Sequence, residues 1–248
     1  MLAAERRQHI LRAVRAGTAH VSELAERFAV SEMTVRRDLA ELERRGKLER
    51  VHGGAVSVGS EPPFAQIAVE RLDVKDRIGR AAAALVEDGQ TVMIDIGTTT
   101  LQVAHHLRGR RLTVITSNLA VLDELASDPE IELILPGGIV RRNYRSLVGV
   151  LAEDTLRQLR ADIAFLGASA VAADLAVMDS TMVEVPIKRA MLAAADRTVL
   201  CVDGAKFAMG GVVRICACTA LDTIVTDTSA PADSRGALEE AGVEVLIA

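Results

Sequence analysis

Short apolar segments alternate with amphipathic stretches over most of this chain, and this alternation limits the folds that are open to it. The segments with the length of strands are 92–94, 112–115, 132–135, 163–166, 198–202, 223–225 and 243–247. Helical patterns cover 75–86, 101–107, 119–126, 150–159, 182–195 and 233–241. Strands that alternate with helices at this spacing form βαβ units. We therefore predict an α/β domain with a mainly parallel sheet that is covered on both faces.

The first 58 residues follow a different pattern. Helical periodicity predicts three helices, over 3–16, from Ser22 to about 29, and from Ser31 to Gly46. Two short strands, 47–51 and 55–58, then flank a turn at Gly53–Gly54. Two helices joined by a tight turn and followed by a hairpin predict a small winged helix-turn-helix domain.

Composition places the domain boundary after this module. Residues 59–64 read Gly-Ser-Glu-Pro-Pro-Phe, and the two prolines forbid regular pairing. We predict a winged helix-turn-helix domain at 1–58, a linker at 59–74 and a larger α/β domain at 75–248. Residues 1–57 carry eleven Lys and Arg against eight Asp and Glu, a net charge of +3. The remaining residues have a net charge of −8, so the whole chain has −5. A basic module on an acidic body favours a polyanionic partner for the first domain.

Several classes of protein are excluded by composition. The three cysteines, Cys201, Cys216 and Cys218, lack the C-x-x-C spacing of a zinc site and are too few for a disulfide framework. No apolar run reaches the roughly 20 residues that cross a bilayer. We expect a cytoplasmic protein with no metal, no cofactor and no membrane partner.

The third predicted helix carries the side chains that suit a DNA groove. Its polar surface and the adjoining hairpin hold the DNA-binding candidates Ser31, Thr34, Arg36, Arg37, Arg44, Arg50 and His52. This helix is the second helix of the helix-turn-helix motif, and the N-terminal residues of that helix contact base edges. Arginine can bind guanine with two hydrogen bonds. We expect one of Arg36 and Arg37 to bind a base and the other a phosphate. The alternative is a solvated face on which the arginines pair with Glu41 and Glu43.

A run from Asp95 to Thr100 follows one predicted strand and precedes a helix. Gly97 lets the backbone approach an anion, and amides at a helix N-terminus together with threonine hydroxyls can bind phosphate. The alternative is that these threonines only cap the helix. Loops at 116–118, at 137–138 and at Asp203 with Lys206 follow other strands, and ligands bind at this edge of open α/β sheets.

These segments together resemble the DeoR family of transcriptional regulators. The resemblance in the first domain rests on 21–25, 30–31, 34–39, Leu42, 46–48 and 50–55. It is highly specific there, and a second similarity covers about 61–228. The resemblance implies a sensor domain with the fold of ribose-5-phosphate isomerase, glucosamine-6-phosphate deaminase and the CoA transferases. The implied and candidate effector-binding residues are Lys75, Asp95, Gly97, Thr98, Thr99, Thr100, Thr116, Asn118, Gly137, Gly138, Glu184, Lys188 and Lys206.

The family implies a function with three partners. We expect a regulator, more often a repressor, of a carbohydrate operon, which binds double-stranded operator DNA as a homo-oligomer and responds to a phosphorylated sugar. It is not expected to be an enzyme. Two alternatives remain: a sugar-phosphate isomerase or deaminase that uses Glu184 and Lys206 as acid and base, and an architectural DNA binder whose second domain is structural.

Individual residues keep alternatives as well. Glu184 and Lys188 lie four apart, so they either border the pocket or form an exposed ion pair on a helix. Asp95 either contacts the ligand or ties down its own loop. His105 and His106 are expected on a solvated helix face, and the loop at 141–145 either covers an anionic ligand or forms a subunit interface.

Overall fold

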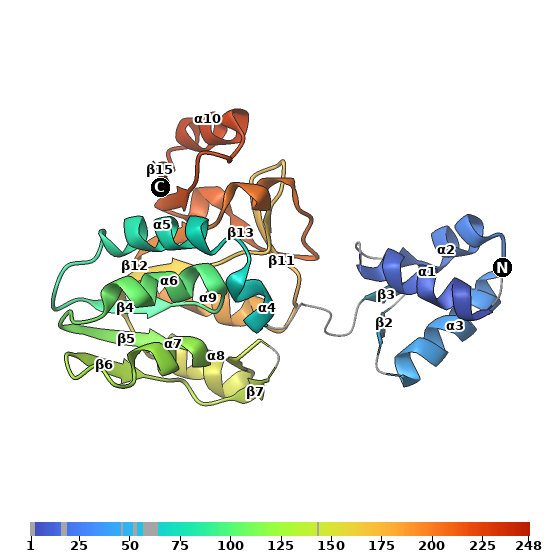
Figure 1. Cartoon of the computed structure of the whole chain (residues 1–248), viewed down its shortest axis with the longest axis horizontal. Helices are drawn as coiled ribbons and strands as arrows, with labels where there is room; N and C mark the ends of the chain where they lie inside the picture. Colours follow the sequence, from blue (N-terminus) through green and yellow to red (C-terminus); the bar gives the residue numbers. More distant parts are fainter. Residues whose placement is uncertain (1–2, 16–18, 46, 52–53, 57–63, 143) are drawn as a thin grey trace. The chain divides into compact units, whose positions relative to one another are not determined.

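The chain folds into two compact units, Met1–Pro62 and Pro63–Ala248. A computed structural model describes residues 3–15, 19–45, 47–51, 54–56, 64–142 and 144–248. Figure 1 labels most of the helices and strands of the two units. Each unit has its own apolar core, so each is described by itself.

The first unit is a three-helix module with a small antiparallel sheet. Its elements are α1 (Ala3–Arg15), β1 (Ala19–His20), α2 (Val21–Phe28), α3 (Glu32–Arg44), β2 (Glu49–Val51) and β3 (Gly54–Val56). Val35 and Leu39 of α3 are buried with Leu24 of α2 and Ile10 of α1. The predicted helices and hairpin are therefore present. Strand β1 was not predicted; it pairs with β3, so the sheet order is β1-β3-β2.

The second unit is built on a seven-stranded sheet. Its strands are β4 (Thr91–Ile94), β5 (Leu112–Thr116), β6 (Ile131–Ile134), β9 (Ala161–Leu166), β12 (Ala195–Cys201), β14 (Thr223–Thr226) and β15 (Glu244–Ile247). They lie in the order β15-β14-β12-β9-β4-β5-β6, and every neighbouring pair is parallel. All seven correspond to predicted strands, which confirms the mainly parallel sheet.

Helices cover both faces of this sheet (Figure 1). One face packs α5 (Leu72–Ala83), α6 (Thr98–Leu107) and α7 (Leu119–Leu125), and the other packs α8 (Val150–Arg157), α9 (Val185–Ala194) and α10 (Ala232–Glu240). The side chains of β4 show why: Val92 and Ile94 join the first core, whereas Met93 joins the second. Successive side chains of a strand point to opposite faces, so a continuous apolar strand needs a helix layer on each.

Short antiparallel strands were not predicted. Strands β7 (Ile139–Arg141) and β8 (Ser146–Val148) form a hairpin, and β10 (Ala170–Val171), β11 (Ala176–Asp179) and β13 (Val213–Ala217) form a separate sheet. Two short 3-10 helices, η1 (Gly204–Ala208) and η2 (Cys218–Ala220), lie in loops. These strands lie outside the alternation of strands and helices on which the prediction was based.

The segment between the units differs from the predicted linker. Residues 64–74 do not form a linker: they contain α4 (Phe64–Val69) and the first turn of α5, and both belong to the second unit. The reason is apolar burial, because Phe64 is buried and Val74 packs on the core. Among the described helices, none combines the length and the apolarity that crossing a membrane requires.

Candidate functional site

The exposed surface of α3 is the candidate nucleic-acid interface. Ser31 caps the helix: its side chain accepts a hydrogen bond from the Thr34 amide (3.2 Å), and the two hydroxyl oxygens lie 2.9 Å apart. Ala29 adopts φ 50°, which makes the tight turn between α2 and α3. The front of α3 is thereby held rigidly, with its hydroxyls toward the surface.

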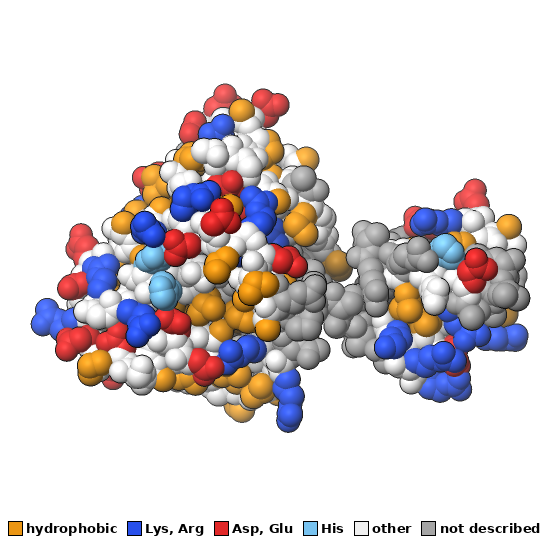
Figure 2. Space-filling model, in the orientation of Figure 1, with side chains coloured by type: hydrophobic (Ala, Val, Ile, Leu, Met, Phe, Trp, Pro, Cys, Tyr) orange, Lys and Arg blue, Asp and Glu red, His pale blue; other side chains and the backbone are white. Residues whose placement is uncertain are grey.

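Arginines beside this front differ in their partners. Arg36 pairs with Glu32 (3.0 Å), and Arg44 pairs with Glu41. Arg37 is exposed and has no ion-pair or hydrogen-bond partner among the described residues. Figure 2 shows Lys and Arg side chains gathered on the part of the first unit where α3 lies. Of these arginines, Arg37 has the guanidinium best placed to bind an incoming partner.

Four further residues complete the description of this surface. Met33 is 67% exposed beside the helix front, although it was not among the predicted DNA contacts. The predicted Arg50 lies in β2, but its side chain and the whole of His52 lie outside the described residues. Asp38 is buried and bonds Arg6 (2.6 Å). Asp38 therefore holds α1 against α3 and does not face the surface.

The candidate effector site lies at the carboxyl edge of the large sheet, where β4 and β9 meet. From β4 the chain continues to β5 and β6 on one side, whereas β9, β12, β14 and β15 follow on the other. Connections diverge here, which leaves a crevice at the strand ends in open α/β folds. The residues that follow β4 and β9 are Asp95 and Gly167.

Asp95 and Lys188 form a buried ion pair at this point. The Asp95 Oδ2 atom accepts hydrogen bonds from the Lys188 ammonium and from the Gly167 amide (2.9 Å). Lys188 also donates to the Gly167 carbonyl (2.9 Å) and lies 3.6 Å from Asp179. The two carboxylates raise the pKa of Lys188 despite its complete burial. Lys188 is thus fixed in its charged form at the floor of the site.

Glu184 is 1% exposed, so the alternative of an exposed Glu184–Lys188 ion pair is wrong. Its Oε1 atom accepts from Ser146 Oγ (2.6 Å) and from Arg141. Burial raises the pKa of Glu184, although Ser146 and Arg141 oppose this shift. The hairpin β7–β8 supplies both partners, so the 141–145 loop is joined directly to the site.

The Asp95–Thr100 loop has the geometry expected for an anion cradle. Gly97 caps α6 with φ 131°, a conformation that favours glycine. Thr98 is buried and Thr99 is half-buried in the first turn. The Thr100 hydroxyl instead donates to the Asp95 carbonyl (2.8 Å). This corrects the expectation that all three hydroxyls face a ligand, because Thr100 uses its proton to close the loop.

Thr116 and Asn118 likewise hold the loops together. Thr116 Oγ1 donates to the Ile94 carbonyl (2.6 Å) and accepts from the Asn118 amide (3.0 Å). The Asn118 side chain caps α7 and reaches the Asp95 and Gly97 carbonyls (3.4 Å each). Both residues are fully buried, so they support the cradle from behind.

Gly137 and Gly138 follow β6 and contribute through backbone packing. At Gly138, which has φ 151°, a Cβ atom would lie 2.7 Å from the Val148 carbonyl oxygen. Gly138 therefore allows the chain to pass close to β8. Both glycines are exposed and belong to the base of the β7–β8 hairpin.

Lys75 and Lys206 add positive charge at the same edge. Helices α5 and α6 both run antiparallel to β4 and touch where Gly79 meets Gln102, so their first turns, which hold Lys75 and Thr98, lie on the same side of this contact. Lys75 is buried and donates to the Ile67 carbonyl (2.6 Å). Burial lowers the pKa of Lys75, Asp203 opposes this, and Lys206 adds to it. A phosphate near these lysines would meet two positive charges.

Buried polar atoms without partners lie at this edge of the sheet. Among the described residues, Asp95 Oδ1, Ser117 Oγ and Glu184 Oε2 are buried and accept or donate no hydrogen bond. They come from the β4 end, the β5 end and the start of α9. Native proteins rarely leave such atoms unpaired unless a ligand or water pairs with them.

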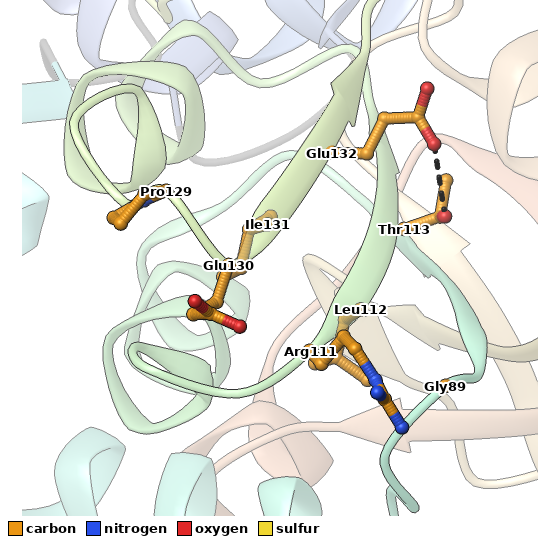
Figure 3. A pocket seen from close by; sticks show the side chains of 8 residues that line it. All are labelled: Gly89, Arg111, Leu112, Thr113, Pro129, Glu130, Ile131 and Glu132. Carbon is orange, nitrogen blue, oxygen red and sulfur yellow. Dashed lines mark hydrogen bonds between the residues drawn. The ribbon is translucent and has the colours of Figure 1, made fainter.

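Other candidate positions have simpler roles. His105 bonds Glu124 (2.9 Å) and His106 bonds Asp76 (2.8 Å), and no metal-binding cluster is found in the described part of the chain. Figure 3 shows a separate hollow between the amino ends of β5 and β6, where Thr113 donates to Glu132 (3.4 Å). This hollow lies at the opposite edge from Asp95 and holds none of the predicted site residues.

Comparison with known proteins identifies both units. The family model of the DeoR-like helix-turn-helix domain matches residues 6–61. The family model of the DeoR C terminal sensor domain matches residues 70–228. The chain belongs to the DeoR family. As a DeoR-family transcriptional regulator, it is grouped with regulators and not with enzymes, as its sequence relatives also indicate.

Three relatives cover nearly the whole chain. The DeoR-family chain is 32% identical over 250 residues to the putative aga operon transcriptional repressor of Escherichia coli O157:H7, with 98% of this chain and 93% of that one covered. It is 35% identical over 252 residues to the HTH-type transcriptional regulator GlpR of Haloferax volcanii (99% and 98%). It is 34% identical over 218 residues to the glycerol-3-phosphate regulon repressor of Escherichia coli strain K12 (87% and 86%).

Solved structures show more distant similarity. Ribose 5-phosphate isomerase A from Methanocaldococcus jannaschii is 19% identical with a TM-score of 0.42, over 56% of this chain and 55% of that one. The full-length sorbitol operon regulator SorC from Klebsiella pneumoniae is 12% identical with a TM-score of 0.36, over 76% and 85%.

The structure adds three residues, Gly167, Asp179 and Ser146, to the site of this DeoR-family chain, and it gives a role to Ser117, which the sequence placed only within the 116–118 loop. Gly167 and Asp179 contact Lys188, Ser146 contacts Glu184, and Ser117 presents a buried hydroxyl. Gly167 lies at the carboxyl end of a predicted strand, so its position could have been found. Asp179 and Ser146 lie on the short antiparallel strands, which gave no sequence signal.

Proposed function

We propose that this DeoR-family chain is a repressor that binds operator DNA through α3 and releases it when a phosphorylated sugar occupies the carboxyl edge of the sensor sheet. One observation carries the ligand assignment: buried, unpartnered oxygens of Asp95, Ser117 and Glu184 lie at the edge that also carries the first turn of α6 and the Lys75 ammonium. The proposed ligand therefore carries both an anionic group and groups that form hydrogen bonds.

The two ends of the proposed ligand contact different groups, hydrogen-bond donors at one end and acceptors at the other. Amides after Gly97 and the Thr98 and Thr99 hydroxyls are hydrogen-bond donors by their chemistry, which suits the oxygens of a phosphate. The free oxygens of Asp95 and Glu184 are acceptors, so they fit the hydroxyl groups of a sugar and would repel a second phosphate. A molecule with one phosphate and several hydroxyls satisfies both ends.

The proposed DNA contact follows from the exposed front of α3. Arg37, which has no partner among the described residues, is proposed to bind a base edge, whereas Arg36, held by Glu32, is proposed to bind a phosphate. Ser31 and Thr34 lie at the helix N-terminus, which enters the groove first in this class of motif. The names of three relatives, two of which are called repressors, support this direction of regulation.

Two or more copies are proposed to act together. One helix-turn-helix reads only a few base pairs, and a symmetric dimer doubles the contact on repeated half-sites. A change of tenfold to a hundredfold in operator affinity would require about 1.4 to 2.8 kcal/mol of coupling between the ligand and DNA sites. The ligand supplies this coupling only if it binds the two conformations unequally.

Ligand binding is tested by titration calorimetry on the full chain. The probes are glycerol 3-phosphate, ribose 5-phosphate and glucose 6-phosphate, each with its unphosphorylated counterpart. Thr98→Val removes one hydroxyl that donates to phosphate, so the dissociation constant of the best phosphorylated probe should rise about tenfold to a hundredfold, the equivalent of a charged hydrogen bond. Thr91→Val is the matched control, because Thr91 lies at the amino end of β4.

The outcome separates a phosphate site from a site for a neutral sugar. The control variant should bind the same probe as tightly as the parent chain. Equal affinity of phosphorylated and unphosphorylated probes, or an unchanged dissociation constant in Thr98→Val, would remove the phosphate from this loop.

A further inference from the structure

Helix α4 (Phe64–Val69) lies at the amino-terminal end of the sensor unit. It is the first helix after the boundary at Pro62–Pro63, and it belongs to the sensor unit. Any displacement of α4 therefore moves the end of the sensor unit that is connected, along the chain, to the DNA-binding unit. The contacts of α4 lead to the candidate effector site by two routes.

The first route passes through aromatic and charged side chains. Phe64 is buried, and its ring meets the Tyr144 ring edge-on with 6.2 Å between centroids, a favourable aromatic geometry. The Arg141 guanidinium lies 5.6 Å from the centre of the same Tyr144 ring. Arg141 also pairs with Glu184, which is a proposed ligand contact.

The second route is a single hydrogen bond. The Lys75 ammonium donates to the carbonyl of Ile67, in the last turn of α4, over 2.6 Å. Lys75 lies beside the first turn of α6, where the proposed phosphate binds. Since the carbonyl of Ile67 is neutral and a phosphate is charged, a phosphate is the stronger acceptor for this ammonium.

Helix α4 depends on these contacts for its structure. It has six residues, and isolated helices of this length are not stable in water. The junction with α5 is Arg71, which adopts the left-handed conformation (φ 51°) that non-glycine residues disfavour. The Arg71 side chain pairs with Asp203 (3.0 Å) at the same edge of the sheet. The docked position is thus maintained by side chains of the site itself.

We propose that α4 is the element that transmits ligand occupancy to the DNA-binding unit. In the ligand-free chain, Lys75 and the Arg141–Tyr144 contact hold α4 in place. A phosphate recruits Lys75 from the Ile67 carbonyl, and a sugar hydroxyl engages Glu184, the partner of Arg141. Both contacts that hold α4 are then weaker, and α4 leaves its docked position. This inference rests on the proposed function, because it assigns the regulatory consequence of binding at the same site.

Hydrogen exchange of the full chain tests the proposal. Saturation with the tightest of the three sugar phosphates should make the amides of 65–70 exchange about tenfold or more faster, because docking no longer protects them. The amides of 98–102 should exchange more slowly, since they report binding at the first turn of α6. Protection at 98–102 without any change at 65–70 would overturn the role of α4.

Variants test the same inference without a ligand. Lys75→Met and Arg141→Met each remove one route, so both should accelerate exchange at 65–70 by about tenfold in the ligand-free chain while the core strands stay protected. Arg142→Met is the matched control, because Arg142 is an exposed neighbour of Arg141.

Two different failures can be told apart. Exchange at 65–70 that is the same in both variants as in the parent chain would overturn the inference. If no sugar phosphate protects 98–102, the proposed function fails, and the two variants alone then decide whether the site residues hold α4.

Discussion

At the scale of single residues, the buried pair of Lys188 and Asp95 dominates the sensor site. Lys188 is 2% exposed and Asp95 is fully buried, so neither charge is compensated by bulk water. Gly167 and Asp179 complete the environment of the ammonium. Such a cluster costs desolvation energy, and removal of one member leaves the other charges buried without a partner.

Lys188→Met should therefore lower the free energy of unfolding of the sensor unit by about 3 to 5 kcal/mol. Lys206→Met, at a half-buried lysine of the same edge, should change it by less than about 0.5 kcal/mol. Guanidinium unfolding followed by circular dichroism measures both. A loss in Lys188→Met no larger than in the control would mean that Lys188 is not paired as described.

Sequence reasoning was least accurate at this scale. Glu184 and Lys188 were expected to border the pocket, but their spacing of four residues on a helix left an exposed ion pair open as an alternative. Each instead bonds residues distant in the chain, Ser146 in one case and Asp95 in the other. Spacing along a helix gives the face on which a residue lies, but the partner on that face depends on the packing of other elements.

At the scale of elements, close packing of α5 on α6 sets the position of Lys75 beside Thr98. Gly79 makes this approach possible: a Cβ atom at Gly79 would lie 2.5 Å from Gln102 Cβ and 2.6 Å from its backbone carbon. A backbone atom cannot move aside as a flexible side chain can. The two helices would have to separate.

Gly79→Ala should lower the free energy of unfolding by about 1 to 3 kcal/mol, because overpacking exceeds the gain in helix propensity. Gly236→Ala is the matched control. Gly236 lies inside α10 with no atom within 4 Å of a built Cβ, so alanine there should stabilise the chain by about 0.5 to 1 kcal/mol. Thermal and denaturant unfolding measure both changes, and a shift of the same sign in the two variants would contradict the packing argument.

Helices and parallel strands were predicted well because apolar strand segments and amphipathic helices alternate regularly along the chain. The β7–β8 hairpin was not, since its strands of three residues carry no repeated pattern. Helix α4 was missed for a related reason: prolines at 62 and 63 indicated a linker, whereas burial of Phe64 and the Lys75 bond to Ile67 stabilise the turns that follow.

At the scale of the whole molecule, charge is divided between the units. The first 57 residues carry +3 and the remainder −8, so attraction to DNA is confined to the basic unit while the sensor unit repels it. This division favours binding through α3 alone and a strong dependence of affinity on salt.

Arg37→Ala and Arg36→Ala should each weaken binding to a duplex from the region upstream of the chain's own gene by about 1 to 3 kcal/mol. If Arg37 binds a base, its loss should also reduce the preference over random duplex. If Arg36 binds a phosphate, its loss should weaken binding to all duplexes and reduce the slope of log affinity against log salt by about 1. Fluorescence anisotropy at several salt concentrations measures these effects.

The control for DNA binding is Arg160→Ala, at an exposed arginine of the sensor unit that pairs with Asp196 (2.9 Å). It should leave affinity unchanged. Unaltered affinity in both α3 variants would remove the assignment of α3, and a sedimenting mass of one chain on DNA would contradict the proposed oligomer.

The sequence alone determined the two-part organisation, the order of helices and parallel strands, and the loops that follow each strand, because apolar periodicity and turn residues are local properties of the chain. It also carried the DeoR resemblance. The tertiary structure alone decided which loop residues are available to a ligand: Thr100, Thr116 and Asn118 bond the backbone, whereas oxygens of Asp95, Ser117 and Glu184 are buried without partners. Hydrogen-bond partners are set by elements brought together from distant parts of the chain, and local pattern cannot encode that geometry.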